Sequence, residues 1–152
     1  MPPVKSPAEL TTLFRAQGLK VTPQRQAIFR ILHGAESHPT AESVHAAVTR
    51  EMPTVSLRTV YQTLNDLAEM GEILQLDLGT GSARFDPNVD THHHLVCEQC
   101  GRVVDVYADT AALKVAPRQR HGFEITTTEV VFRGTCADCR STVQHHRKES
   151  DA

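Results

Sequence analysis

The stretch that decides the fold of the amino-terminal half is Ser56–Phe85, which reads SLRTVYQTLNDLAEMGEILQLDLGTGSARF. Ser56 is a good helix N-cap, and the helix predicted over Leu57–Met70 ends at Gly71. Apolar side chains recur at helical spacing and form one inward face, made of Val60, Leu64, Leu67 and Ala68. The opposite face is polar and is therefore available for contact with a partner.

A hairpin is predicted directly after this helix. Two short strand-like runs, Ile73–Leu78 and Ser82–Phe85, flank a Gly79-Thr80-Gly81 turn. A polar-faced helix followed by a hairpin is informative only in the context of the elements before it.

Three shorter helices are predicted upstream. The first covers Glu9–Gln17, the second opens at Thr22-Pro23 and ends at Gly34, and the third is capped by Thr40 and ended by Pro53. Helices followed by a polar-faced helix and a hairpin are the order of a winged helix-turn-helix. In that fold the last helix enters the major groove of DNA and the hairpin lies along the backbone.

The polar helix face supplies the candidate contacts with double-stranded DNA. Arginine can bind guanine or phosphate, glutamine can bind adenine, and tyrosine and threonine can contact thymine methyl groups. An ordinary solvated helix face is the alternative, and the winged-helix order decides against it. The predicted contacts are Ser56, Arg58, Thr59, Tyr61 and Gln62, with Lys20 and Arg25 nearby for phosphates.

Composition excludes some classes of protein. The 152 residues carry a formal charge of −2, which argues against a generally basic coat for nucleic acid but allows a local basic surface. No apolar run approaches the roughly 20 residues of a membrane span, and Met1–Pro7 lacks the order of a signal peptide. We therefore expect a cytoplasmic protein without a membrane partner.

The second half has a different pattern. Strands are predicted at Leu95–Val96, Val103–Tyr107 and Glu129–Phe132, with a helix over Thr110–Arg120. The expected class is α+β, with a small α/β domain after the winged helix. The predicted divisions are a winged-helix DNA-binding domain at 1–85, a hinge at 86–90, a second domain at 91–143 and a polar tail at 144–152.

All four cysteines of the chain lie in two C-x2-C pairs, Cys97 with Cys100 and Cys136 with Cys139. Two thiolates around each tight turn can point at one ion, and two such turns complete a tetrahedral sulfur shell. Redox-active pairs are the alternative, but two pairs in one short domain favour metal. A site of four thiolates leaves no position for water, so we expect a structural zinc ion.

Histidines and aspartates form a second candidate cluster. His92 and His94 share one strand face, since side chains alternate along a strand, and the carboxylates of Asp86 and Asp105 are candidates to join them. Nitrogen and oxygen ligands of this kind suit iron, manganese, zinc or nickel. A solvated turn with incidental histidines explains the spacing equally well, and His38 alone is a weaker candidate.

Taken together, the motifs resemble the ferric uptake regulator superfamily of metal-responsive bacterial repressors over nearly the whole chain. The resemblance implies a homodimer that binds a palindromic operator, with 91–143 as the α/β dimerisation and metal-binding domain and structural zinc on the four cysteines. It also implies a second, regulatory metal site on His38, Asp86, His92, His94 and Asp105. The motifs are Val21-Thr22-Pro23-Gln24-Arg25, His38-Pro39-Thr40-Ala41, Ser56 with Thr59-Val60-Tyr61 and Leu64, Arg84-Phe85-Asp86, His92-His93-His94 running into Cys97-x2-Cys100-Gly101, Val104-Asp105, and Gly134-x-Cys136-x2-Cys139.

Within the superfamily, Asp86 after Phe85 resembles the peroxide-sensing branch, whose regulatory site takes iron(II) or manganese(II). There, oxidation of a ligand histidine, here matching His38 or His92, releases DNA. Thr128 stands where many members have a histidine, so a third metal site is not expected. The alternatives are an iron-, zinc- or nickel-uptake regulator, a zinc-ribbon metalloenzyme and a zinc-stapled adaptor, and we expect no enzymatic activity.

Overall fold

The structure is a computed structural model that describes residues 4–35, 38–79 and 81–142, and the polar tail predicted at 144–152 lies outside these residues. The chain divides into two compact units, the first ending at Asp90 and the second beginning at Thr91. No helix among the described residues has the length and apolar character needed to cross a bilayer.

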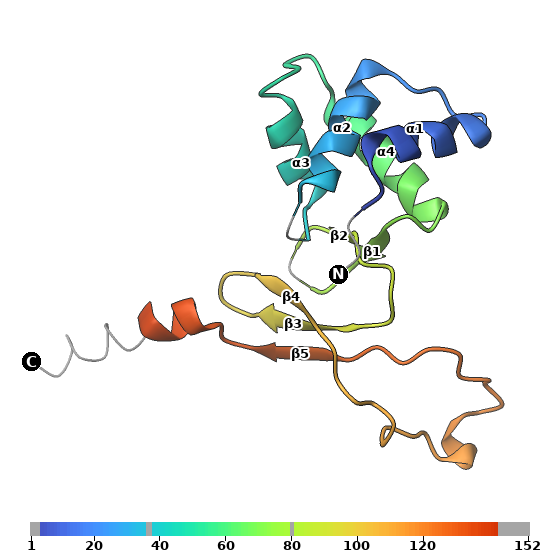
Figure 1. The fold of residues 1–152 in the computed structure, drawn as a ribbon. Helices are drawn as coiled ribbons and strands as arrows, with labels where there is room; N and C mark the ends of the chain where they lie inside the picture. The colour runs from blue at the N-terminus through green and yellow to red at the C-terminus, as the bar shows by residue number, and fades with distance from the viewer. Residues whose placement is uncertain (1–3, 36–37, 80, 143–152) are drawn as a thin grey trace, which may run out of the picture. The chain divides into compact units, whose positions relative to one another are not determined.

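Helices make up most of the first unit (Figure 1). Each of them begins at a hydroxyl cap. The side chains of Ser6, Thr22, Thr40 and Ser56 each accept the backbone N–H three residues ahead, which satisfies one of the open donors at a helix start. Three of these caps were predicted. The helices are α1 (Pro7–Ala16), α2 (Pro23–His33), α3 (Ala41–Val48) and α4 (Leu57–Glu69).

A two-stranded antiparallel hairpin follows α4. Strands β1 (Leu74–Leu76) and β2 (Arg84–Asp86) pair with Gln75 opposite Phe85. The Phe85 N–H also donates to the Pro39 carbonyl at 2.9 Å, which ties the hairpin to the loop before α3. Helices followed by this hairpin give the predicted winged-helix arrangement. Asp86, which the sequence reasoning assigned to a hinge, is the last residue of β2.

The core of the first unit is apolar and closed. Phe14 of α1 and Phe29 of α2 meet edge to face with ring centroids 4.9 Å apart, and both are fully buried. Leu64 and Leu67 of α4 are buried beside Phe85 of β2 in the same cluster. Each such side chain stabilises the fold by roughly 1.5–3 kcal/mol through removal of apolar area from water. This burial fixes α4 with its polar face outward.

The second unit contains a three-stranded sheet in the order β4-β3-β5. Strand β3 (His93–Cys97) lies in the middle, antiparallel to β4 (Val103–Val106) and parallel to β5 (Val131–Gly134). A central strand has its backbone bonded on both sides, so its side chains have fixed directions. The α+β prediction is confirmed by the helices of the first unit and the two sheets.

The helix predicted over Thr110–Arg120 is wrong. Within that stretch the structure has a turn closed by the Leu113 N–H and the Thr110 carbonyl and a short 3-10 helix, Pro117–Gln119, but no α-helix. Ala116, immediately before the proline, has φ −58° and ψ 143°, an extended conformation that the proline ring imposes on its predecessor. Leu113 and Val115 are 59% and 41% exposed, so no burial compensates for the proline.

Candidate metal sites and nucleic-acid interface

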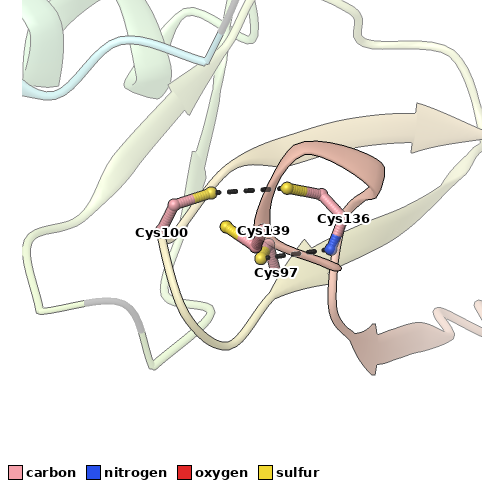
Figure 2. Close-up of side chains that lie close together, drawn as sticks. All are labelled: Cys97, Cys100, Cys136 and Cys139. Atoms are coloured by element: carbon pink, nitrogen blue, oxygen red, sulfur yellow. Dashed lines mark hydrogen bonds between the residues drawn. The ribbon is translucent and has the colours of Figure 1, made fainter. Parts of the chain in front are cut away.

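Figure 2 shows the four cysteine side chains gathered at one end of the three-stranded sheet. Cys97 ends β3, Cys100 follows in a turn closed by Gly101, Cys136 comes just after β5 and Cys139 lies in a helical segment at 137–142. Gly101 has φ 74°, a conformation that glycine adopts without strain, as the sequence reasoning anticipated for this turn.

The sulfur positions fit a tetrahedral zinc ion. All four Sγ atoms lie within 4.8 Å of one another, and those of Cys100 and Cys136 are 3.8 Å apart. Zinc–sulfur bonds of about 2.3 Å in a tetrahedron separate neighbouring sulfurs by about 3.8 Å. The four residues are free cysteines. The geometry therefore fits one zinc ion held by four thiolates.

Electrostatics at the cluster also favour a cation. The Cys97 sulfur accepts backbone N–H groups, first that of Cys100 and then that of Cys136, and these lower the pKa of the Cys97 thiol to about 6. A hydrogen bond with the Cys136 sulfur raises the pKa of Cys139 to about 12. Without a positive ion, one thiolate forms readily and a second sulfur resists ionisation. A divalent cation would stabilise all four thiolates together.

A second donor set is formed by residues of strands β3 and β4 and by the residue just before β3. His92 Nε2 is 3.0 Å from His94 Nε2, and Asp105 Oδ1 lies 3.3 Å from the first and 3.7 Å from the second. His94 and Asp105 are opposite each other across β3 and β4, which places them on one face with His92. A metal about 2.1 Å from each ligand atom separates neighbouring donors by about 3.0–3.5 Å. The three side chains therefore fit one metal ion.

Glu129 and His93 also make contacts next to this donor set. Glu129, which the sequence reasoning missed, has its Oε1 3.3 Å from His94 Nδ1, on the far side of the ring from Asp105. Strand alternation places His93 on the face opposite His92 and His94, and its ring has a different partner. This buried ring accepts the Val130 N–H at 3.1 Å through Nδ1, and so ties β3 to the residue before β5.

The first unit holds a buried histidine–carboxylate pair. His38 Nε2 and Asp86 Oδ2 are 3.1 Å apart, with side chains 6% and 0% exposed. Asp86 Oδ1 accepts the Asn88 N–H at 2.8 Å, which fixes the carboxylate at the end of β2. Both residues were predicted as metal ligands, and the structure of this unit brings them together. Imidazole and carboxylate form a donor pair that suits iron or manganese.

The residues predicted to contact DNA differ in their exposure and in their hydrogen bonds. Arg58, Tyr61 and Gln62 are exposed, as is Lys20 ahead of α2. Ser56 and Thr59 are committed to the helix cap: Ser56 Oγ accepts the Thr59 N–H at 3.1 Å and lies 3.0 Å from Thr59 Oγ1. Tyr61 has a partner that the sequence reasoning missed, since its hydroxyl donates to Glu42 of α3 at 2.7 Å.

Arg25 has a different environment from the one predicted. Its side chain is only 12% exposed and its guanidinium bonds Asp66 of α4 at 3.1 Å. A second nitrogen donates to the Lys20 carbonyl at 3.0 Å, and the group lies 5.3 Å from the Phe14 ring centre. These contacts hold α4 against α1 and α2. They explain Arg25 better as an internal anchor than as a contact to phosphate.

Comparison with known proteins gives consistent results. Residues 16–133 match the ferric uptake regulator family. The peroxide-responsive repressor PerR of Staphylococcus aureus is 35% identical over 127 residues, covering 83% of this chain and 86% of the relative. The Helicobacter pylori ferric uptake regulator superposes with a TM-score of 0.72 at 20% identity, covering 92% and 97% of the two chains. The regulator from Pseudomonas aeruginosa with manganese is 29% identical, with a TM-score of 0.61 over 84% and 97%.

Proposed function

Because the chain belongs to the ferric uptake regulator family, whose members are metal-responsive transcriptional regulators rather than enzymes, we propose that it is a peroxide-sensing repressor. In this proposal the metal-loaded protein binds operator DNA, and peroxide releases it. The observation that carries the proposal is the pair of histidines and one carboxylate formed by His92, His94 and Asp105. Such a set is the donor arrangement used by non-haem iron(II).

The complete regulatory site of the proposal adds His38 and Asp86 from the first unit to His92, His94 and Asp105 from the second. An ion shared by two parts of a chain binds one arrangement of those parts better than others, and so shifts the population toward that arrangement. Iron(II) or manganese(II) would fill this site. Bound iron(II) would supply the electron that splits the O–O bond of peroxide. One peroxide oxygen would then be added to a ring carbon of His38 or His92; both ring nitrogens would remain, but the oxidised ring would no longer serve as a metal ligand.

Zinc on Cys97, Cys100, Cys136 and Cys139 has a structural role in the proposal. A closed sulfur site offers no position for substrate, and its first two ligands flank the turn that follows β3. Cys97 lies on the same strand as His94. Zinc would therefore brace the strand that carries the regulatory ligands.

A homodimer completes the proposal. The second unit exposes large apolar side chains that a second copy would cover, and a dimer with two recognition helices matches a palindromic operator. Operator binding implies a cytoplasmic location. The exposed apolar residues are Leu95, Val104, Tyr107, Leu113, Val115, Phe123, Ile125 and Phe132.

A metal-uptake regulator is the second candidate function. The Pseudomonas aeruginosa regulator with manganese is 29% identical and shares the fold, which supports a repressor that responds to the ion itself. The two candidates differ in one respect. A peroxide sensor loses DNA when iron-loaded protein meets peroxide, whereas an uptake regulator loses DNA when the ion is withdrawn.

The metal dependence can be tested on a duplex recovered from a random library by in vitro selection with the manganese-loaded protein. Manganese(II) added to zinc-retaining protein should raise affinity for this duplex, measured by fluorescence anisotropy. Asp105→Asn should abolish the rise while zinc content stays at one per chain. Asp109→Asn is the matched control, because Asp109 is exposed and bonds only locally, to the Ala111 N–H. DNA affinity independent of manganese would contradict the proposal.

A further inference from the structure

The hydroxyl of Tyr61 is directed by an acidic residue on another helix. Tyr61 lies in the first half of α4 and is 36% exposed, and its hydroxyl donates to Glu42 Oε1 at 2.7 Å. Glu42 belongs to the first turn of α3. A carboxylate can only accept here, so the direction of this hydrogen bond is fixed.

The surroundings of Glu42 favour its ionised form. Its carboxylate accepts the Tyr61 hydroxyl at 2.7 Å, and this hydrogen bond is the main cause that lowers the pKa of Glu42 below its usual range. Thr40 is the N-cap of α3, and the start of a helix carries partial positive charge that favours an anion. Glu42 is therefore an ionised acceptor for the Tyr61 hydroxyl.

The phenol of Tyr61 has a single proton, which limits the hydrogen bonds that its oxygen can make. With that proton bound to Glu42, the Tyr61 oxygen can only accept a further hydrogen bond. Phosphate oxygens, guanine N7 and O6, and thymine O4 are all acceptors, and only the adenine N6 and cytosine N4 amino groups donate in the major groove. The Glu42 carboxylate also repels a phosphate placed beside the hydroxyl.

We infer that Glu42 is a specificity-determining residue that acts through Tyr61. By holding the hydroxyl proton, Glu42 makes Tyr61 select adenine or cytosine as the base that it contacts, because their amino groups donate, and makes it reject phosphate and the acceptor edges of guanine and thymine. This inference rests on the proposed DNA-binding function. The alternative is that the Tyr61–Glu42 hydrogen bond only stabilises the packing of α3 against α4, and the experiment must distinguish this from a role in specificity.

The test uses the selected duplex and a set of its single base-pair substitutions, with anisotropy titrations for each variant of the full-length, manganese-loaded protein. Glu42→Ala should reduce discrimination at one symmetric pair of positions by about three- to tenfold, since the freed hydroxyl can then donate to acceptor bases. Tyr61→Phe should lose discrimination at the same positions. Glu42→Gln retains a carbonyl acceptor and should keep the preference while binding all duplexes more tightly.

The matched control is Glu69→Ala, which removes an exposed carboxylate from the far end of α4. It should leave discrimination unchanged at every position. In a Tyr61→Phe background, Glu42→Ala should cause no further loss of discrimination. Circular dichroism checks that each variant is folded, and Glu42→Met replaces Glu42→Ala if the alanine variant unfolds.

Failure of the inference and failure of the proposed function give different results. If the wild-type protein enriches no sequence from the library, the proposed function is wrong. If the wild type binds a selected duplex but Glu42→Ala changes affinity for all duplexes by the same factor, Glu42 acts only as a charge and the inference is overturned. Unchanged discrimination in Tyr61→Phe would overturn it equally.

Discussion

Replacement of Arg25 by methionine separates an internal anchor from a DNA contact. Methionine keeps much of the apolar stem but removes the charged bonds to Asp66 and the Lys20 carbonyl and the contact with Phe14. Hydrogen bonds to charged groups contribute about 1.5–3 kcal/mol and a cation–π contact about 0.5–2 kcal/mol, depending on its exposure. Because these terms overlap, we expect the free energy of unfolding to fall by about 2–3 kcal/mol.

The assay is urea unfolding followed by circular dichroism at a helix wavelength, which reports the first unit because helices α1 to α4 all lie there. Asp66→Asn in the same background closes a double-mutant cycle that isolates the pairwise energy. Arg30→Met is the matched control. Its ion pair with Glu51 has side chains that are both 52% exposed, so its removal should cost less than about 1 kcal/mol.

A role of Arg25 in contacting phosphate would give a different pair of results. If Arg25 were a phosphate contact, Arg25→Met would leave unfolding unchanged and would reduce the salt dependence of DNA binding. One lost phosphate contact lowers the slope of log affinity against log salt by about 0.9. That pair of results would refute the anchor role, whereas a destabilised variant with an unchanged slope would support it.

Three further predictions concern the metal sites and the turn before α4. Cys100→Ser should reduce zinc from one per chain to none by elemental analysis, because the tetrahedral set loses a sulfur that lies 3.8 Å from its neighbour. Glu129→Gln should weaken manganese binding by about tenfold in a competition titration, since the carboxylate beside His94 Nδ1 orients that ligand; an unchanged affinity would exclude this role. His45→Ala should lower the free energy of unfolding by about 1 kcal/mol in urea titrations, because His45 Nε2 bonds the Val55 carbonyl at 2.9 Å; no change would mean that this bond is not stabilising.

The amino-terminal fold was predictable because its signals are local. Caps at Thr22, Thr40 and Ser56 and the apolar face of α4 act within a few residues of themselves, and the helices begin where these residues predict. The paired cysteines were equally informative. Two C-x2-C pairs predict a common sulfur cluster, and the structure brings the four side chains together.

Other features depend on contacts between distant residues. Arg25 precedes Asp66 by 41 positions, and nothing in the local sequence distinguishes a buried guanidinium from an exposed one. The partnership of Glu42 with Tyr61 has the same origin, because it depends on how α3 packs beside α4. The helix predicted over Thr110–Arg120 fails for a local reason, since Pro117 disfavours the helical conformation at Ala116.

The most direct test of peroxide-controlled repression compares two metal loadings of one DNA complex. Protein that retains zinc is loaded anaerobically with iron(II) or with manganese(II), bound to the selected duplex, and exposed to hydrogen peroxide while anisotropy is followed. Peroxide should release DNA from the iron form only, and mass spectrometry should find one added oxygen atom on His38 or His92. Equal retention of DNA by both forms, with neither histidine oxidised, would contradict peroxide sensing.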